Sequence, residues 1–317
     1  MAEIITIGEV LVEIMAKNID QTFEKPGEFV GPFPSGAPAI FIDQAAKCGS
    51  QSLIISAVGN DGFGRMNLQR LKRDGVDVSQ IKVLEGQTTG VAFVTYHKDG
   101  ERDFIYHISN SACGTIDEND VHEDDFKDCN FFHVMGSSIY NRNIYLAIMK
   151  GMDLTINNGG KISFDPNVRK EIITDNEKRN LLINILYRSH IVMLGEKELY
   201  YLMGTNQEEK NVEMLLKSGV EMIVVKRGNR GATLYTQENK LNVEAYPVVE
   251  VDSTGAGDCF GGTFVSCLNQ GLNPLLAVRL ATLAGAKAVT KKGPMEGNTT
   301  LEELKKLYEE HYHKKLF

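Results

Sequence analysis

The segment DSTGAGD, at positions 252–258, contains the residues of this chain whose types and spacing most strongly suggest chemistry. An apolar, β-branched run precedes it and an apolar helical pattern follows it, which predicts a strand, a Gly-rich turn and a helix. The first N–H groups of a helix have no partner within the helix, and together with the helix dipole they attract anions such as phosphate. Asp258 would lie in the first helical turn, where a bound phosphate repels its carboxylate. Accepting a proton from an attacking hydroxyl group would explain this position, and a plain helix cap is the alternative.

Two other phosphate-binding motifs do not fit the segment. The chain contains no GxxxxGK[ST] sequence of the Walker type. Gly255, Gly257 and Gly261 superficially resemble a dinucleotide fingerprint, which is followed by an acid about 20 residues further along. Positions 270–280 contain no acid, and the segment lies late in the chain, so a dehydrogenase is not expected.

Composition narrows the partners and the compartment that we expect for these 317 residues. The formal net charge of −8 argues against nucleic acid or an anionic membrane as the main partner. The five cysteines form no CxxC pair, which favours free thiols in a reducing compartment over a disulfide framework or a zinc site. The N-terminus lacks a basic region, and no apolar run approaches ~18 residues. We therefore expect a cytoplasmic protein without a signal peptide or a transmembrane helix.

The elements that must position the Gly-rich segment alternate between strand-like and helical patterns. This alternation predicts an α/β fold, a single domain over 1–317 with a mainly parallel central sheet covered on both faces. The predicted strands are 3–7, 52–58, 131–134, 161–164, 190–194, 222–225 and 247–251. The predicted helices are 37–47, 63–74, 177–188, 197–203, 256–270, 275–290 and 301–312.

One region departs from this alternation. Two strand-like runs, 90–97 and 102–108, are joined by a segment that contains Asp99 and Gly100, and Asp-Gly is a strong hairpin signal. The segment 10–30 lacks a helical period and could add another strand. We expect segments 10–30 and 88–108 to form a small β lid over the carboxyl edge of the main sheet, where open α/β sheets bind ligands. A plain surface hairpin is the alternative.

Several motifs, in order along nearly the whole chain, resemble those of the PfkB (ribokinase-like) carbohydrate kinase family. The segment 252–258 is similar to the family's specific D-T-x-G-A-G-D motif, with Ser253 in the position of Thr. The other matching segments are Gly8-Glu9, PSGAPA at 34–39, AVGNDGFG at 57–64, DPNVR at 165–169, LGEKE at 194–198 and VKRGNRGA at 225–232. The resemblance is nearest to the 2-keto-3-deoxygluconate kinase and fructokinase branch. It implies a ribokinase-like three-layer sandwich with a β-sheet lid, and ATP-dependent phosphorylation of a sugar hydroxyl.

The resemblance also implies roles for individual residues. Asp258 would be the catalytic base, and the N–H groups of the Gly-Ala-Gly run before it would hold charge on the transferred phosphoryl group. Glu198 would hold Mg²⁺ through water, although Gly195 stands where the family motif has Asn. The run that supplies N–H groups is Gly255, Ala256 and Gly257, and the residues expected at ATP are Lys226, Gly228, Gly231 and Asn167.

The sugar site that the resemblance implies departs from the family pattern at several positions, among them Ser35 in place of a Gly and Glu13 in place of an Asp. Ile40 replaces the Asn of the N-terminal motif, and His107 occupies the position of a lid arginine. Arginine pairs with carboxylates through a fork that histidine lacks, so His107 favours a neutral hexose or ketose, with Arg102 and Arg169 as substitutes for a sugar acid. The expected substrate-binding residues are Glu13, Gly36, Tyr106, His107, Arg169 and Asp258.

The family also suggests partners that the residues alone do not reveal. Some relatives bind a monovalent cation such as K⁺ through main-chain oxygens near Asp252, Thr254, Ala288 and Gly293. Family members often pair lid against lid, so we expect a homodimer. Two alternatives stay open at this point: a kinase of another substrate such as a nucleoside, and a non-catalytic sugar-binding regulatory protein. The intact Gly-rich segment with Asp258 argues against the second.

Overall fold

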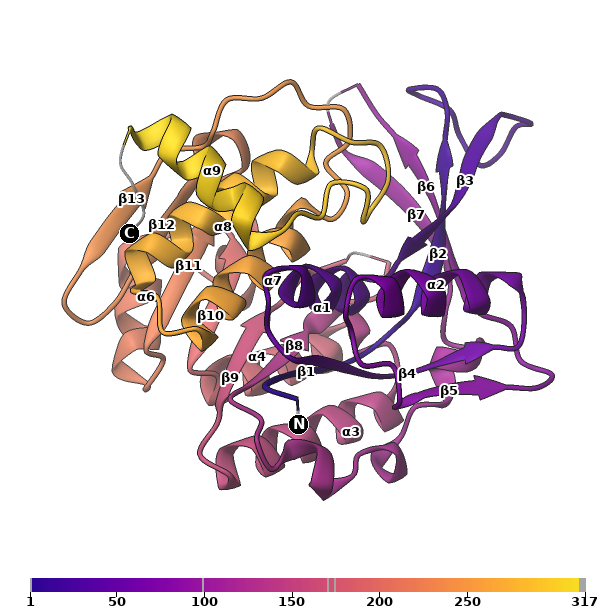
Figure 1. The fold of residues 1–317 in the computed structure, drawn as a ribbon, viewed down its shortest axis with the longest axis horizontal. Helices are drawn as coiled ribbons and strands as arrows, with labels where there is room; N and C mark the ends of the chain where they lie inside the picture. The colour runs from indigo at the N-terminus through magenta and orange to yellow at the C-terminus, as the bar shows by residue number, and fades with distance from the viewer. Residues whose placement is uncertain (1, 99, 170, 174, 314–317) are drawn as a thin grey trace.

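The computed structural model describes residues 2–98, 100–169, 171–173 and 175–313, and its strands form two separate sheets (Figure 1). The larger sheet runs in the order β13-β12-β11-β10-β9-β8-β1-β4-β5. Its strands pair in parallel from β11 to β5, and only β12 and β13 pair antiparallel, at one edge. The strands are β1 (Ile4–Ile7), β4 (Ser52–Gly59), β5 (Ile81–Leu84), β8 (Phe131–Met135), β9 (Lys161–Asp165), β10 (Ile191–Gly195), β11 (Met222–Lys226), β12 (Ala232–Tyr235) and β13 (Lys240–Val243).

Helices cover both faces of this sheet, as the continuous burial of β1 and β4 requires. One core lies under α3, α4, α5 and α6, and the other lies under α1, α2, α7, α8 and α9. The expected three-layer α/β arrangement is therefore confirmed. The helices are α1 (Ala37–Lys47), α2 (Gly62–Arg73), α3 (Arg142–Asn157), α4 (Asn176–Arg188), α5 (Glu196–Met203), α6 (Glu208–Lys217), α7 (Ala256–Asn269), α8 (Pro274–Ala288) and α9 (Leu301–Tyr312). None of the helices in the described ranges is long and apolar enough to cross a membrane.

The smaller sheet is formed by the segments expected to make a lid, and it stands apart from the main layers at the upper right of Figure 1. We call it the lid. It consists of β2 (Leu11–Ala16), β3 (Phe29–Ser35), β6 (Gly90–Tyr96) and β7 (Arg102–His107), in the order β3-β2-β6-β7. The strands β6 and β7 form the expected antiparallel hairpin, whose Asp99 lies outside the described residues. The segment 10–30 contributes β2 and the start of β3, two strands where the sequence suggested one.

The predicted strand 247–251 is wrong. Residues 244–250 are irregular, and the N–H groups of Val251 and Asp252 both donate to the carbonyl of Val289 at the end of α8. The run follows β13 in the chain but pairs with no strand of the described sheets, and Val249 is 83% exposed. β-Branched residues favour a strand only where a partner strand and a half-buried face are available.

Candidate active site

The first turn of α7 lies between two cavities at the carboxyl edge of the main sheet. Gly255 and Asp258 line a cavity beneath the lid, which we call the lid cavity. Ala256 and Gly257 line a second cavity of about 460 Å³, formed mostly by residues 226–289, which we call the C-terminal cavity. One helical turn therefore contributes to both.

The backbone of this turn is fixed by close packing and by one carboxylate. Gly255, the residue before α7, has a positive φ of 78°, and a Cβ atom there would lie 2.2 Å from the carbonyl oxygen of Pro294. Only glycine fits such a position at low cost. The carboxylate of Asp252 accepts hydrogen bonds from the N–H groups of Thr254 (3.0 Å) and Gly293 (2.9 Å). Glycine has no side chain to cap the helix, so the start of α7 has no side-chain cap, and the N–H of Ala256 makes only a long hydrogen bond of 3.4 Å to the carbonyl of Ser253. Such a helix N-terminus can accept an anion.

Asp258 is buried, with 7% of its surface exposed. Burial raises the pKa of this carboxyl to about 7, the nearby Asp165 adds to the increase, and the cations of Arg169 and Lys226 oppose it. Asn167 Nδ2 donates to Asp258 Oδ1 over 3.4 Å. A carboxyl group with a pKa near neutral pH can accept a proton during a reaction and release it afterwards.

Lys226 ends β11 and forms an ion pair with Asp165, which ends β9. Burial alone would lower the pKa of Lys226, but the Asp165 and Glu198 carboxylates outweigh it and raise the pKa, so the ammonium group keeps its charge. Its Nζ lies 3.4 Å from the point where a Cβ atom of Gly257 would be. A cation and the helix N-terminus therefore meet in the C-terminal cavity.

The structure places most of the residues predicted for ATP in this same cavity. Lys226, Gly228 and Gly231 line it, together with Ala256 and Gly257. Asn167 is the exception, because it lies beside Asp258 and is not among the residues that line the C-terminal cavity.

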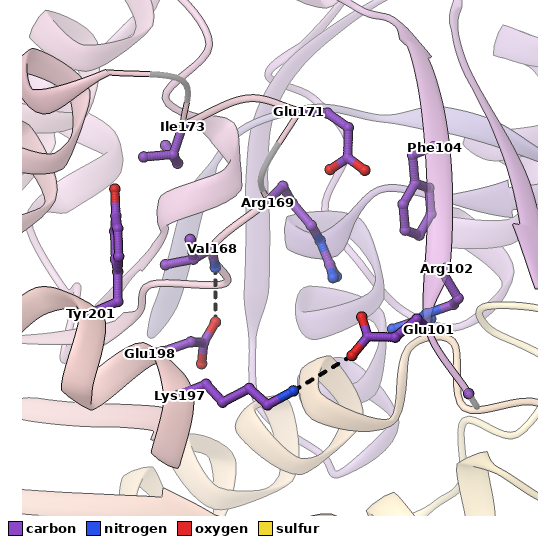
Figure 2. Close-up of a pocket in the computed structure, with 11 residues that line it drawn as sticks. Glu101, Arg102, Phe104, Val168, Arg169, Glu171, Ile173, Lys197, Glu198 and Tyr201 are labelled. Carbon is purple, nitrogen blue, oxygen red and sulfur yellow. Dashed lines mark hydrogen bonds and ion pairs between the residues drawn. The ribbon is translucent and has the colours of Figure 1, made fainter. Parts of the chain in front are cut away.

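Glu198, in the first turn of α5, joins the start of that helix to the loop after β9 (Figure 2). Its Oε1 accepts a hydrogen bond from the N–H of Val168 (2.8 Å), and its Oε2 accepts one from the N–H of Gly195 (2.7 Å). Within the described ranges, no group of three or more His, Cys, Asp and Glu side chains could hold a metal ion. Magnesium usually keeps several waters and uses one or two protein carboxylates, and each Glu198 oxygen retains a lone pair. The carboxylate thus fits a water-mediated metal contact, and it also holds the 167–169 loop against α5.

The lid cavity brings together nearly all of the predicted sugar-site residues. Its lining includes Glu13, Gly36, Tyr106, Arg169 and Asp258, but not His107. His107 is exposed and packs edge-on against Phe93, with ring centroids 6.2 Å apart. Successive side chains of a strand point to opposite faces, so Tyr106 and His107 cannot both face the cavity.

Arg102 and Phe104 share the face of Tyr106 and line the lid cavity. Arg102 was expected only as a substitute partner for a sugar acid, and Phe104 was not predicted. Arg102 Nη1 donates to Thr254 Oγ1 over 3.2 Å, which joins the lid to the segment before α7. The guanidinium groups of Arg102 and Arg169 lie 5.6 and 5.5 Å from the ring centroid of Phe104. The strand alternation could have predicted Phe104, and the side on which Arg102 lies, had the register of β7 been known.

Two glutamates also line the lid cavity. Glu13 Oε2 accepts a hydrogen bond from Ser35 Oγ (3.0 Å), and burial raises the pKa of Glu13 to about 7, against the opposing charge of Arg102. Glu9 accepts a hydrogen bond from Ser138 Oγ (2.6 Å), and burial raises its pKa as well. Glu9 was noted in the sequence as the end of the first strand, but no ligand contact was predicted for it.

A third cavity, of about 480 Å³, adjoins the lid cavity and shares Arg102, Phe104 and Arg169 with it. Figure 2 shows Arg169 pointing into the space between the lid hairpin and α5. At its rim, Lys197 of α5 and Glu101 of the hairpin form an ion pair of 3.5 Å. The lid therefore contacts the body of the protein next to the site.

Comparisons with known proteins agree with this fold. An Escherichia coli protein described as a putative ribokinase II has 47% sequence identity and a TM-score of 0.93, over 98% of this chain and all of that one. The same protein has been solved with ATP and Mg²⁺, with a TM-score of 0.92. A Vibrio cholerae fructokinase, solved with fructose, ADP and calcium, has 26% identity and a TM-score of 0.84 over 96% of this chain and 98% of that one.

The sequence comparisons cover almost the whole chain. Fructokinase-1 of Oryza sativa subsp. japonica is 29% identical over 315 residues, which are 96% of this chain and 97% of the relative. The model of the pfkB family carbohydrate kinases matches residues 1–301. The fold is ribokinase-like, as the resemblance implied. The chain belongs to the pfkB family of carbohydrate kinases.

Proposed function

We propose that this protein transfers the γ-phosphate of ATP to a hydroxyl group of a small sugar, of the ketohexose or 2-keto-3-deoxygluconate type, with Asp258 as the general base. The observation that carries this proposal is the position of the first turn of α7 between the lid cavity and the C-terminal cavity. A sugar beneath the lid and a nucleotide in the C-terminal cavity would meet at this turn. The ATP and Mg²⁺ complex of the Escherichia coli relative supports the nucleotide assignment.

The chemistry follows from the residues at the turn. The Asp258 carboxylate accepts the proton of the sugar hydroxyl as the sugar oxygen bonds to the γ-phosphorus of ATP. At the same time the bond between the γ-phosphorus and the oxygen that bridges it to the β-phosphorus breaks. The N–H groups of Gly255, Ala256 and Gly257 hold the negative charge on the transferred phosphoryl group. Lys226 adds a fixed cation on the nucleotide side. The products are a sugar phosphate and ADP, and Asp258 then releases its proton.

Metal ions complete the proposal. Mg²⁺ would neutralise the phosphates, and Glu198 would hold it through water. Asp252 fixes the turn before α7, near which the family resemblance implies a monovalent cation, and a fructokinase double mutant of Vibrio cholerae has been solved with potassium. We expect activation by K⁺ on the same grounds.

Fructose is the first acceptor to test, because curated relatives are fructokinases and one solved relative holds fructose. The lid residues that would contact it are Glu13 and Tyr106, with Gly36, Arg169 and Asp258 from the body. The two guanidinium groups of Arg102 and Arg169 also suit a sugar acid, so His107 in place of a lid arginine no longer argues for a neutral sugar.

The experiment is a screen of ATP consumption over sugars, sugar acids and nucleosides with the wild-type protein. Turnover with a ketohexose or 2-keto-3-deoxygluconate supports the proposal. Turnover with nucleosides alone would replace the acceptor but keep the phosphoryl transfer. Binding of a sugar by calorimetry without any turnover would favour the non-catalytic alternative and contradict the proposal.

A further inference from the structure

Two buried polar atoms of the lid cavity have no hydrogen-bond partner within the described part of the chain. They are Glu13 Oε1 and Ser137 Oγ, and each residue is only 4% exposed. A polar atom gives up its hydrogen bonds to water on burial, so folded proteins leave few such atoms unpaired. Glu13 already has a proposed contact with the sugar, whereas nothing so far explains Ser137.

The backbone holds Ser137 in a fixed position. It is the middle residue of a 3₁₀ turn, Gly136–Ser138, that directly follows β8. A Cβ atom on Gly136 would lie 2.2 Å from the carbonyl oxygen of Pro166, so the turn packs tightly on the 165–169 loop. On the other side, Ser138 Oγ donates to Glu9 over 2.6 Å. The neighbours of Ser137 are anchored while its own hydroxyl is not used, which is the arrangement of a group prepared for a ligand.

The other walls of the cavity indicate what that ligand offers. Glu13 comes from the lid strand β2, and Asp258 and Arg169 come from the body, as Ser137 does. A carboxylate oxygen only accepts hydrogen bonds, an arginine only donates them, and a serine hydroxyl does both. A polyhydroxylated molecule satisfies all three kinds of group at once, because each of its hydroxyls can donate and accept.

We propose that Ser137 is a specificity-determining residue, whose hydroxyl forms a hydrogen bond with a hydroxyl or carbonyl oxygen of the acceptor sugar. This inference rests on the proposed function, and it adds a contact from the body of the protein to those from the lid. The contact is separate from Asp258, so it selects the sugar without taking part in proton transfer. Ser137 thereby discriminates against acceptors that lack the oxygen it contacts, since its own hydroxyl then stays buried and unpaired.

The test compares Ser137→Ala with a matched control, Ser189→Ala. Ser189 is also 4% exposed, but its hydroxyl donates to the carbonyl of Ile185 (2.7 Å) at the end of α4. With D-fructose and ATP, Ser137→Ala is expected to raise the KM for fructose about 3- to 10-fold, the range of one neutral hydrogen bond. Its KM for ATP should stay unchanged, because the contact lies on the sugar. Its melting temperature without ligands should not fall, because the hydroxyl has no hydrogen-bond partner to lose. Ser189→Ala should do the reverse, with a lower melting temperature and an unchanged KM.

A series of monodeoxy fructoses locates the contact. Each analogue lacks one hydroxyl group. If the loss of a given hydroxyl lowers kcat/KM in the wild type but not in Ser137→Ala, that hydroxyl carries the oxygen that Ser137 contacts. If the wild type uses another acceptor from the screen, the deoxy analogues of that acceptor replace those of fructose. An active Ser137→Ala variant with the wild-type KM and the wild-type deoxy profile overturns the inference alone, and would mean that water pairs with the hydroxyl. A wild type that phosphorylates none of the acceptors overturns the proposed function first.

Discussion

Asp258 combines a buried position with a carboxyl group whose pKa is raised to about 7, well above its ordinary value of 3.8. Between these two values the folded protein binds more protons than the unfolded chain does, so the free energy of unfolding falls as pH rises from about 4 to about 7. Asp258→Asn removes this titration. We expect the melting temperature of the variant to exceed that of the wild type by an amount that grows over this pH range and then levels off.

Differential scanning fluorimetry of both proteins between pH 4 and pH 8 measures that difference. A difference that stays constant across the range, or that shrinks as pH rises, would show that Asp258 is ionised in the folded protein throughout. The expected gain in stability is the usual consequence of removing a functional group that the fold buries at a cost.

His107 provides a second prediction at this scale. Its side chain lies on the outer face of β7, so His107→Gln should leave kcat/KM for fructose and for 2-keto-3-deoxygluconate unchanged at pH 6 and at pH 8. Arg102→Gln, on the inner face, should lower kcat/KM more for the acid than for the neutral sugar if the acid is used at all. A change of acceptor preference with pH in the wild type that His107→Gln abolishes would contradict the placement of His107.

The sequence predicted individual site residues as far as motifs reach. Asp258, Glu13, Gly36 and the glycines near Lys226 occupy motif positions, and the structure gathers them at two adjoining cavities. Ser137 could not be predicted in this way, because a serine after a strand carries no signal until its surroundings are known. The misplacement of His107 has one cause, the unknown register of β7, since shifting a strand by one residue exchanges its two faces.

At the scale of elements, the segments after parallel strands supply the site, and Glu198 joins the loop after β9 to the start of α5. Its carboxylate accepts N–H groups from both Val168 and Gly195. Glu198→Ala should therefore shift the dependence of the rate on free Mg²⁺ to higher concentrations. It should also lower the free energy of unfolding by about 1–3 kcal/mol, because two backbone donors lose their acceptor.

The measurements are the rate against free Mg²⁺ and denaturant unfolding, with Glu196→Ala as the control from the same helical turn. Glu196 pairs with Arg227 and Arg230 and lines none of the described cavities. A loss of stability without any shift in the magnesium dependence would leave Glu198 with a structural role only.

Secondary structure was predictable where a single element shows its own period. The parallel strands and α7 follow from short apolar runs and from the Gly-rich turn. The segment 247–251 has the composition of a strand but joins neither described sheet, and α3 and α6 were not predicted. Such errors arise because a strand needs a partner that only the folded chain supplies.

For the whole molecule, the lid sheet raises the question of assembly. Its outer face carries Phe29 and Ile105, which are 36% and 41% exposed, and Phe93 packs edge-on between Phe29 and His107. Small isolated sheets are marginal in water and gain stability from a second apolar face. We expect a homodimer that pairs lid against lid, and Ile105→Glu should weaken it.

Light scattering at micromolar concentration decides this prediction, with wild type and Ile105→Glu compared at equal concentrations. A monomeric wild type would contradict it, and so would a dimer that Ile105→Glu leaves intact.

The layers of the main body were predictable from the alternation of strands and helices. The order of the strands, which brings Asp165, Lys226 and Asp258 together from distant parts of the chain, was not.

The central claim is that one helical turn serves two substrates, with Asp258 on the sugar side and the nucleotide on the other. The most direct test measures, in the wild type and in Asp258→Asn, both the turnover with ATP and the acceptor found in the screen and the affinity for ATP. We expect turnover to fall ~10²–10⁴-fold, the range for loss of a general base, while the Kd for ATP stays close to that of the wild type. Near-normal turnover in Asp258→Asn would remove Asp258 from the mechanism, and a loss of ATP binding would show that the carboxylate does not lie outside the nucleotide contacts.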